Sequence, residues 1–305
     1  MTRVFVRMGA CFGVAAWLAG CAPVPQASTP APAADAAPAA AGTDTGPFYV
    51  AGRPATFAFA GELTQGGWVK GTVPSGTRAL MLDGQSVAFA PDGSFFAAFD
   101  RDAGPIATLI ATLRTGEKVS QPMAVARRAW KIENINIARR QAGPTEAFLA
   151  LRRPELARIE AARKRQTDAM GWRQDFIWPA KARISGRFGS QRVYRGEPGA
   201  YHSGLDIAGG AGAPFVAPAD GVVILAAERP FTLEGNLLMI DHGMGLNSAF
   251  LHSSAILVRE GEHVKQGQVI GRIGATGRAT GPHLHWSVKW NDARLDPILL
   301  TGPMK

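Results

Sequence analysis

Two histidines on one face of a predicted strand constrain this chain most. His283 and His285 lie in the stretch GRATGPHLH near its C-terminal end, and a strand-like run with Trp286 and Val288 continues from them. Because successive side chains of a strand point to opposite faces, residues two apart share a face. Both imidazoles are therefore predicted to project from the same side of one strand, where they could share a ligand.

Further donors of the kind that zinc binds lie upstream. His202 and Asp206 stand in the Gly-rich segment YHSGLDIAG with three residues between them, and His252 lies on the apolar run SAFLHSS. Four of the six histidines fall in these three motifs. A zinc ion needs three or four nitrogen, oxygen or sulfur donors in tetrahedral geometry. The ordered set, with Gly-rich flanks and hydrophobic runs between, predicts a metal site.

Residues 178–297 resemble the lysostaphin/LytM-type zinc endopeptidases, which cut peptide bridges in bacterial cell walls. The H-x-x-x-D, F-L-H-S and H-L-H motifs carry the resemblance. Their matching positions are His202, Asp206, His252, His283 and His285.

The resemblance implies a role for each of these five side chains. His202, Asp206 and His285 would hold one Zn²⁺ and leave its fourth position open to water, which is typical of a catalytic rather than a structural zinc site. His252 and His283 would be catalytic, one as the base and the other as the group that stabilises the oxyanion. The sequence does not divide these two roles between them.

Other residues near the motifs are expected to lie outside the group of metal ligands and catalytic histidines. Arg192, Tyr194 and Tyr201 precede the first predicted ligand and are expected to form a wall of the cleft. His242, in IDHGMG, is expected to hydrogen-bond within a turn, and His263, in GEHVKQG, is expected to face solvent.

The N-terminal residues 1–20 are typical of a signal peptide, with two arginines before a short apolar stretch that ends at Leu18. Leu18-Ala19-Gly20-Cys21 resembles the lipobox of bacterial lipoproteins, which implies cleavage before Cys21 and acylation of this cysteine. The alternative is an ordinary secreted protein with an unpaired cysteine. The lipoprotein interpretation predicts a protein of the cell envelope, lipid-anchored in the periplasm to the outer membrane, and disfavours nucleic acid as a partner.

Two segments separate the predicted anchor from the charged part of the chain. Residues 21–47 consist almost entirely of Ala, Pro, Ser, Thr and Gly, a composition that predicts a disordered tether. Residues 48–130 alternate in short apolar runs with turn signals such as Asp83-Gly84 and Asp92-Gly93. This pattern predicts a small β-sandwich of immunoglobulin-like shape. It carries no visible chemistry and is interpreted as a spacer or interaction module, or alternatively as a module that covers and restrains the zinc cleft.

Residues 131–176 are predicted to form a basic, partly helical linker. Seven of the nine net positive charges fall in residues 127–173, which hold twelve Lys or Arg against five Asp or Glu. A helical pattern is predicted over 144–171, and Pro154 is expected to divide it into two shorter helices. The basic side chains are interpreted either as a solvated face or as a surface for anionic lipids or wall polymers.

Residues 177–305 contain short apolar runs joined by Gly-rich turns and predict an antiparallel β domain that carries the site. The whole chain is therefore expected to be mainly β. The function implied by the resemblance is a zinc metalloendopeptidase that acts on peptidoglycan, with the D-alanyl-meso-diaminopimelyl bond as its target. The alternative is a non-catalytic LytM-type regulator that activates cell-wall amidases. Protein partners are not indicated.

Overall fold

The computed structural model of the chain describes residues 55–138 and 143–304. The predicted signal peptide, Cys21 and the tether at 21–47 lie outside these described residues. Among the residues that are described, no helix is both long and apolar enough to cross a membrane. The described chain is mainly β, as the sequence predicts, and its sheets are antiparallel apart from one parallel strand pair.

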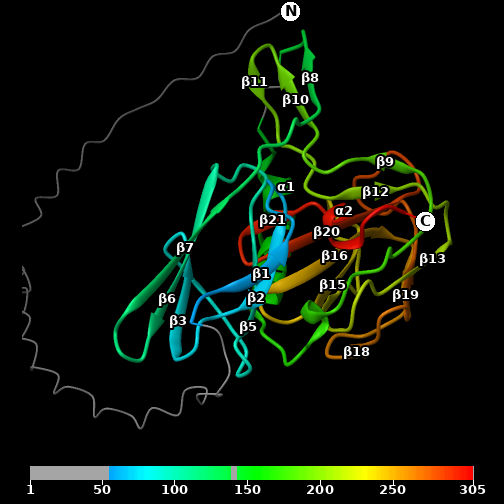
Figure 1. The fold of residues 1–305 in the computed structure, drawn as a ribbon. Helices are drawn as coiled ribbons and strands as arrows, with labels where there is room; N and C mark the ends of the chain where they lie inside the picture. Colours follow the sequence, from blue (N-terminus) through cyan, green and yellow to red (C-terminus); the bar gives the residue numbers. More distant parts are fainter. Residues whose placement is uncertain (1–54, 139–142, 305) are drawn as a thin grey trace, which may run out of the picture. The chain divides into compact units, whose positions relative to one another are not determined.

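Two antiparallel sheets form the N-terminal part of the described chain (Figure 1). Their strands, in sheet order, are β1 (Ala58–Gly61), β2 (Trp68–Thr72) and β5 (Ser94–Ala98), then β4 (Gln85–Val87), β3 (Thr77–Leu82), β6 (Ile106–Leu113) and β7 (Lys118–Ala124). Val69, Phe95 and Leu109 are fully buried in the hydrophobic cluster that both sheets share. Asp83 and Gly84 both adopt the left-handed conformation of a two-residue hairpin and join β3 to β4. The immunoglobulin-like shape stays a prediction.

The linker contains one helix rather than the two that the sequence predicts. Its elements are β8 (Ile132–Ile135), α1 (Glu146–Lys164) and the 3₁₀ turn η1 (Gly171–Arg173). The prediction of a break at Pro154 is wrong, because α1 continues through it. Arg152 donates to Glu234 just before the proline, and Glu155 accepts from the Thr232 hydroxyl just after it. These tertiary bonds hold the helix on both sides and offset the roughly 3 kcal/mol that an interior proline costs.

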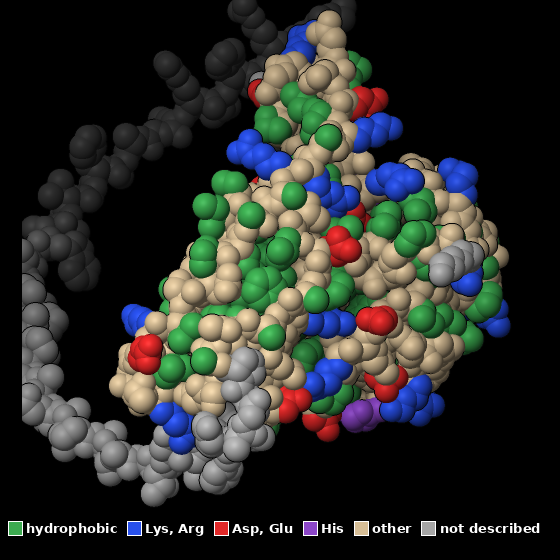
Figure 2. All heavy atoms as spheres, in the orientation of Figure 1, with side chains coloured by type: hydrophobic (Ala, Val, Ile, Leu, Met, Phe, Trp, Pro, Cys, Tyr) green, Lys and Arg blue, Asp and Glu red, His purple; other side chains and the backbone are tan. Residues whose placement is uncertain are grey.

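Carboxylates neutralise much of the linker's positive charge. The ion pairs are Arg152–Glu234, Arg153–Glu146, Arg158–Glu260, Lys164–Glu160 and Arg173–Asp92. On the face drawn in Figure 2, Lys and Arg side chains (blue) are spread over the surface, with Asp and Glu (red) among them. This arrangement favours the solvated face over the polymer-binding surface as the interpretation of the basic segment.

A large antiparallel sheet organises the C-terminal part. Its strands, in sheet order, are β18 (His263–Val264), β14 (Gly221–Ala226), β15 (Asn236–Asp241), β16 (Leu246–Ser253), β20 (Leu284–Trp290), β12 (Leu205–Ile207) and β9 (Ile184–Gly186), with β21 (Ala293–Leu295) beside β20. A smaller sheet holds β13 (Pro214–Val216), β19 (Val269–Arg272) and β17 (Ala255–Ile256). Along β20, Leu284 and Trp286 are fully buried, whereas His285 and Ser287 lie on the opposite face. This alternation places the predicted ligand His285 on the face that carries the site.

The N-terminal sheets contact the C-terminal part directly. Trp68 Nε1 donates to the carbonyl of Leu299 at 2.8 Å, within α2 (Ile298–Thr301). Arg128 donates to Asp296 at 2.7 Å, and Asp296 is only 2% exposed. Because these contacts join the sheets into one unit, the domain boundaries at 130/131 and 176/177 stay predictions.

Candidate metal centre

Strand pairing brings a carboxylate and an imidazole together. β12 pairs with β20 in a register that places Asp206 opposite His285, and Asp206 Oδ1 lies 2.8 Å from His285 Nδ1. His202, on the loop that leads into β12, brings Nε2 to 3.1 Å from each of these two atoms. The three side chains thus offer two nitrogens and one oxygen within 4.8 Å of one another.

The donor set has the chemistry that zinc binds. His202 Nδ1 donates to the carbonyl of Arg187 at 3.1 Å, so its Nε2 presents a lone pair to the other two donors. Two imidazole nitrogens and a carboxylate oxygen that converge in this way suit a shared cation. Three such ligands with a fourth position left for water are typical of catalytic zinc sites.

The pKa shifts of Asp206 and His285 agree with a cation-binding role, whereas the shift of His202 does not. Burial raises the pKa of Asp206, but hydrogen bonds from His202 and His285 outweigh it and hold this pKa well below its usual range. Burial lowers the pKa of His285 and favours its neutral form, the form that binds metals. Burial also lowers the pKa of His202, but the hydrogen bond and charge of Asp206 leave it raised.

The two other predicted histidines lie beside this cluster. His252 ends β16, and its ring centroid lies 4.9 Å from that of His283 and 6.3 Å from that of His285. His252 Nδ1 donates to the carbonyl of Thr276, and His283 Nδ1 donates to the carbonyl of Gly281, each at 2.8 Å. In the neutral tautomer that these bonds select, Nε2 of each ring is an acceptor, and Nε2 of His283 lies 3.6 Å from Asp206 Oδ1. All five residues that the sequence singled out come together.

The sequence analysis missed two glycines that the site requires. A side chain on Gly186, at the end of β9, would meet the carboxylate of Asp206 and come within 3.1 Å of His202 Cε1. A side chain on Gly204 would come within 2.8 Å of His285 Nε2. Both lie in Gly-rich segments, but only the strand pairing reveals which atoms they face. Because glycine has a hydrogen in place of a side chain, both positions leave space for the three donors to converge.

Replacing Gly186 with alanine is expected to lower zinc affinity about 10-fold to 100-fold, the usual effect of disturbing groups that orient metal ligands. The new methyl would overlap the Asp206 carboxylate and push it from the other donors. Competition with a chromogenic chelator measures the affinity. Gly104→Ala is the matched control, because a side chain there meets nothing closer than 4.0 Å. Equal zinc affinity in both variants would contradict the expected crowding.

A cleft of about 1210 Å³ opens beside His202 and Asp206. The three residues predicted to form its wall, Arg192, Tyr194 and Tyr201, line it as expected. The linker also contributes, which the sequence did not indicate: β8 pairs in parallel with β10 (Gln191–Tyr194), which also pairs with β11 (Glu197–Pro198). Lys131 and residues near β8 therefore line the same cleft. The volume is large enough for an extended peptide.

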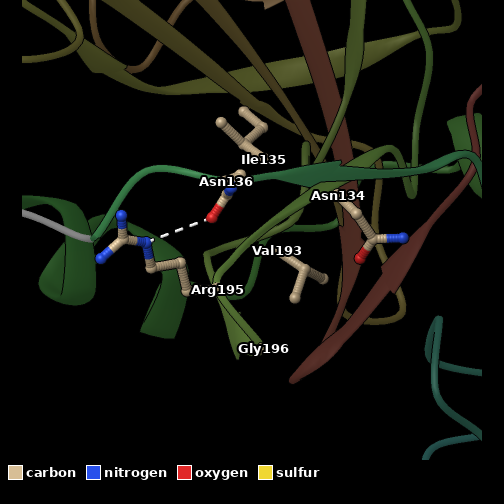
Figure 3. A pocket seen from close by; sticks show the side chains of 6 residues that line it. All are labelled: Asn134, Ile135, Asn136, Val193, Arg195 and Gly196. Carbon is tan, nitrogen blue, oxygen red and sulfur yellow. Dashed lines mark hydrogen bonds between the residues drawn. The ribbon is translucent and has the colours of Figure 1, made fainter.

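A second, smaller cavity of about 230 Å³ lies on the sheet formed by β8, β10 and β11. Its lining residues are Asn134, Ile135, Asn136, Val193, Arg195 and Gly196. Figure 3 shows Arg195 turned toward Asn136, whose Oδ1 accepts from Arg195 Nε at 3.3 Å. None of the five clustered site residues lines this cavity.

The two remaining histidines lie apart from the cluster. His242 is fully buried, and its ring bonds the carbonyl of Asp220 and the hydroxyl of Ser248, each at 2.8 Å. Burial lowers the pKa of His242 to about 4. His263 is exposed on β18. The His242 ring therefore hydrogen-bonds to residues outside the turn instead of within it, whereas His263 is exposed as expected.

Comparisons with known proteins agree with this geometry. Residues 200–297 match the model of peptidase family M23. Over 103 residues the chain is 46% identical to the peptidoglycan DD-endopeptidase ShyB of Vibrio cholerae, which covers 34% of this chain but only 24% of that relative. Over 130 residues it is 35% identical to an NlpD/LppB lipoprotein homologue of Pseudomonas aeruginosa, covering 42% of this chain and 39% of the relative. The chain thus spans well under half of these curated relatives.

A crystal structure from Pseudomonas aeruginosa that is assigned to peptidase M23 extends the likeness beyond the matched segment. It superposes with a TM-score of 0.61 at 29% sequence identity, and the match covers 78% of this chain and 95% of the other. The N-terminal sheets are therefore part of the shared fold. From the family match, the strand topology and these relatives together, the chain contains a peptidase M23 domain of the LytM type.

Proposed function

We propose that this protein is a zinc metalloendopeptidase that hydrolyses peptide cross-links of peptidoglycan, and that its target is the D-alanyl-meso-diaminopimelyl bond. The observation that carries the proposal is the convergence of His202, Asp206 and His285, with His252 and His283 beside them, at the edge of a peptide-sized cleft. In this proposal His202, Asp206 and His285 hold one Zn²⁺. The name of the Vibrio cholerae relative, a DD-endopeptidase, supports the choice of bond.

The proposed chemistry is the addition of water to an amide, with rupture of the C–N bond. A zinc ion held by His202, Asp206 and His285 would lower the pKa of a water in the site and polarise the scissile carbonyl. His252 and His283 present unprotonated Nε2 atoms that can take a proton from the attacking water and pass it to the leaving amine. Once protonated, either ring can donate to the oxyanion of the tetrahedral intermediate. Asp206 would supply the oxygen donor beside the two imidazole nitrogens.

We place the protein in the cell envelope, anchored through acylated Cys21 to the outer membrane. The lipobox-like sequence supports this address, and so does the likeness to an NlpD/LppB lipoprotein homologue. The same likeness favours one alternative function, a non-catalytic regulator of amidases. A regulator needs no zinc donors and no catalytic histidines, whereas this chain keeps all five side chains in one cluster. The clustered site therefore favours the enzyme.

Digestion of isolated sacculi tests the proposal. The zinc-loaded, full-length protein is expected to release uncrosslinked peptides that mass spectrometry identifies, with a new terminus at D-alanine and a freed diaminopimelyl amine. Chelator-treated protein is the control and is expected to release none. Intact cross-links after treatment with zinc-loaded protein, combined with stimulation of an added amidase, would favour the regulator instead.

A further inference from the structure

We propose that Arg101, in the turn between β5 and β6, is a positioning residue for the proposed metal ligand His202. The proposal rests on the proposed function, because it concerns how one of the three zinc donors is held. It assigns to the N-terminal part a role that differs from both a spacer and a cover over the cleft.

Arg101 is a buried cation aimed at the loop that carries His202. Only 6% of the residue is exposed. Its Nη2 donates to the carbonyl of Gly189 at 3.1 Å and to Gln191 Oε1 at 3.0 Å, while Nη1 pairs with Asp102 at 2.7 Å. Burial of a charge is costly unless the charge is paired and hydrogen-bonded, so these partners are strongly held. The guanidinium thus fixes two points of a loop that lies 88 or more residues away in sequence.

The same short stretch of loop fixes His202. The Gly189 amide donates to the carbonyl of His202, and the His202 amide donates to the carbonyl of Ser190, each at 2.8 Å. The carbonyl of Arg187 accepts from the imidazole Nδ1 at 3.1 Å. Residues 187–190 therefore set both the backbone and the ring of this ligand. Arg101 contacts this stretch through the remaining hydrogen-bonding group of Gly189, its carbonyl.

Aromatic side chains complete the support. The Arg101 guanidinium lies 4.6 Å from the ring centroid of Tyr201, the residue next to His202, and 5.2 Å from that of Trp130. The ring of Phe188 packs edge-on against both, with centroid distances of 5.9 Å to Tyr201 and 5.7 Å to Trp130. Gly189 has a left-handed φ of +78°, and a side chain there would overlap Trp130. The guanidinium and these three rings together hold the loop in one position.

Gln191 connects the two ends of the loop. It accepts from Arg101, and its own Nε2 donates to the carbonyl of Gly199 at 2.7 Å, two residues before Tyr201. Removing the guanidinium would therefore free both the start of the loop, at Gly189, and its end, at Gly199. A catalytic zinc site requires its ligands to be held closely in place by surrounding groups. We expect removal of the Arg101 guanidinium to weaken zinc binding while the protein remains folded.

The test compares Arg101→Ala with wild type in the full-length protein. Chelator competition is expected to show zinc bound about tenfold more weakly, the lower end of the range for groups that orient ligands. In zinc-saturated protein, kcat is expected to fall and KM to rise, because Gln191, Gly199 and Tyr201, which Arg101 supports, line the cleft. Arg101→Lys keeps the positive charge but not the guanidinium that bonds both Gly189 and Gln191. Its zinc affinity should therefore lie between those of wild type and Arg101→Ala.

Arg173→Ala is the matched control. Arg173 forms a 2.9 Å ion pair with Asp92 of the N-terminal sheets, and it has no hydrogen bond or ion pair to residues 187–202 among the described parts of the chain. This variant is expected to bind zinc like wild type. Wild-type affinity in Arg101→Ala, or an equal loss in Arg173→Ala, would overturn the inference. If Arg101→Ala does not fold, wild-type affinity in Arg101→Lys would overturn it as well.

Measurements on the wild-type protein distinguish a failure of the proposed function from a failure of the role proposed for Arg101. A wild type that neither binds zinc nor cuts sacculi removes the proposed function and with it this inference. A wild type that does both, with Arg101 variants equal to it, removes the inference alone.

Discussion

Replacing His285 with alanine is expected to remove zinc from the protein and to abolish cleavage of sacculi. His285 Nδ1 lies 2.8 Å from Asp206 Oδ1 and 3.1 Å from His202 Nε2, so it closes the donor triangle. A catalytic zinc site has three protein ligands, and this variant removes one of them. Metal analysis of the purified protein should fall from about one zinc per chain to background, and peptide release should fall to that of chelator-treated wild type.

His263→Ala is the matched control for that result. His263 is exposed on β18, a strand of the same sheet, and belongs to no donor cluster within the described residues 55–138 and 143–304. Its loss should change neither zinc content nor peptide release. When all three proteins have been stripped of metal, both variants should unfold near the temperature of wild type, since bound metal itself adds stability. Full zinc content in His285→Ala would refute the ligand assignment.

The sequence was sufficient to locate the site because its motifs lie on short, regular pieces. The alternation of β20 places His285 on one face regardless of distant contacts, and the H-x-x-x-D spacing turns His202 back toward Asp206. His252 could be placed because its apolar run forms β16, the neighbour of β20. The strand period predicts only the shared face of His283 and His285, whereas the grouping with His202, Asp206 and His252 rests on the ordered motifs and the resemblance that they carry.

The support of the site could not be predicted in the same way. Arg101 contacts Gly189 across 88 residues, and no local pattern marks an arginine that will be buried. Helix α1 continues through Pro154 because Glu155 bonds Thr232, 77 residues further on. Propensity rules describe the chain before such tertiary bonds form, and here the tertiary bonds prevail.

These contacts change what is expected of the N-terminal sheets. A module that restrained the enzyme would raise turnover when deleted. Arg101 instead bonds the loop at Gly189, Trp68 bonds Leu299 in α2, and Arg128 bonds the buried Asp296 just before α2. Deletion of residues 48–130 would expose Asp296 and free Gly189, so we expect it to lower zinc affinity and turnover.

Replacing either His283 or His252 with alanine is expected to lower kcat by about 10²-fold to 10⁴-fold, the usual contribution of a positioned general acid or base. Neither ring is needed to hold zinc in the proposed site, so metal content should stay at the wild-type value. The two rings lie 4.9 Å apart, and each is fixed through Nδ1 to a backbone carbonyl of the turn between Thr276 and Gly281. They are therefore positioned as a pair.

A double variant, His252→Ala with His283→Ala, tests whether the two histidines act as a pair. Groups that serve one proton-transfer sequence are strongly non-additive, because removing the first already stops the sequence that the second completes. We expect the double variant to be only slightly slower than the worse single variant. Steady-state assays on a soluble cross-linked peptide, with zinc content measured on the same samples, supply both quantities. If the two losses instead multiply while zinc is retained, His252 and His283 serve independent steps, and the shared turn at residues 276–281 is only a structural coincidence.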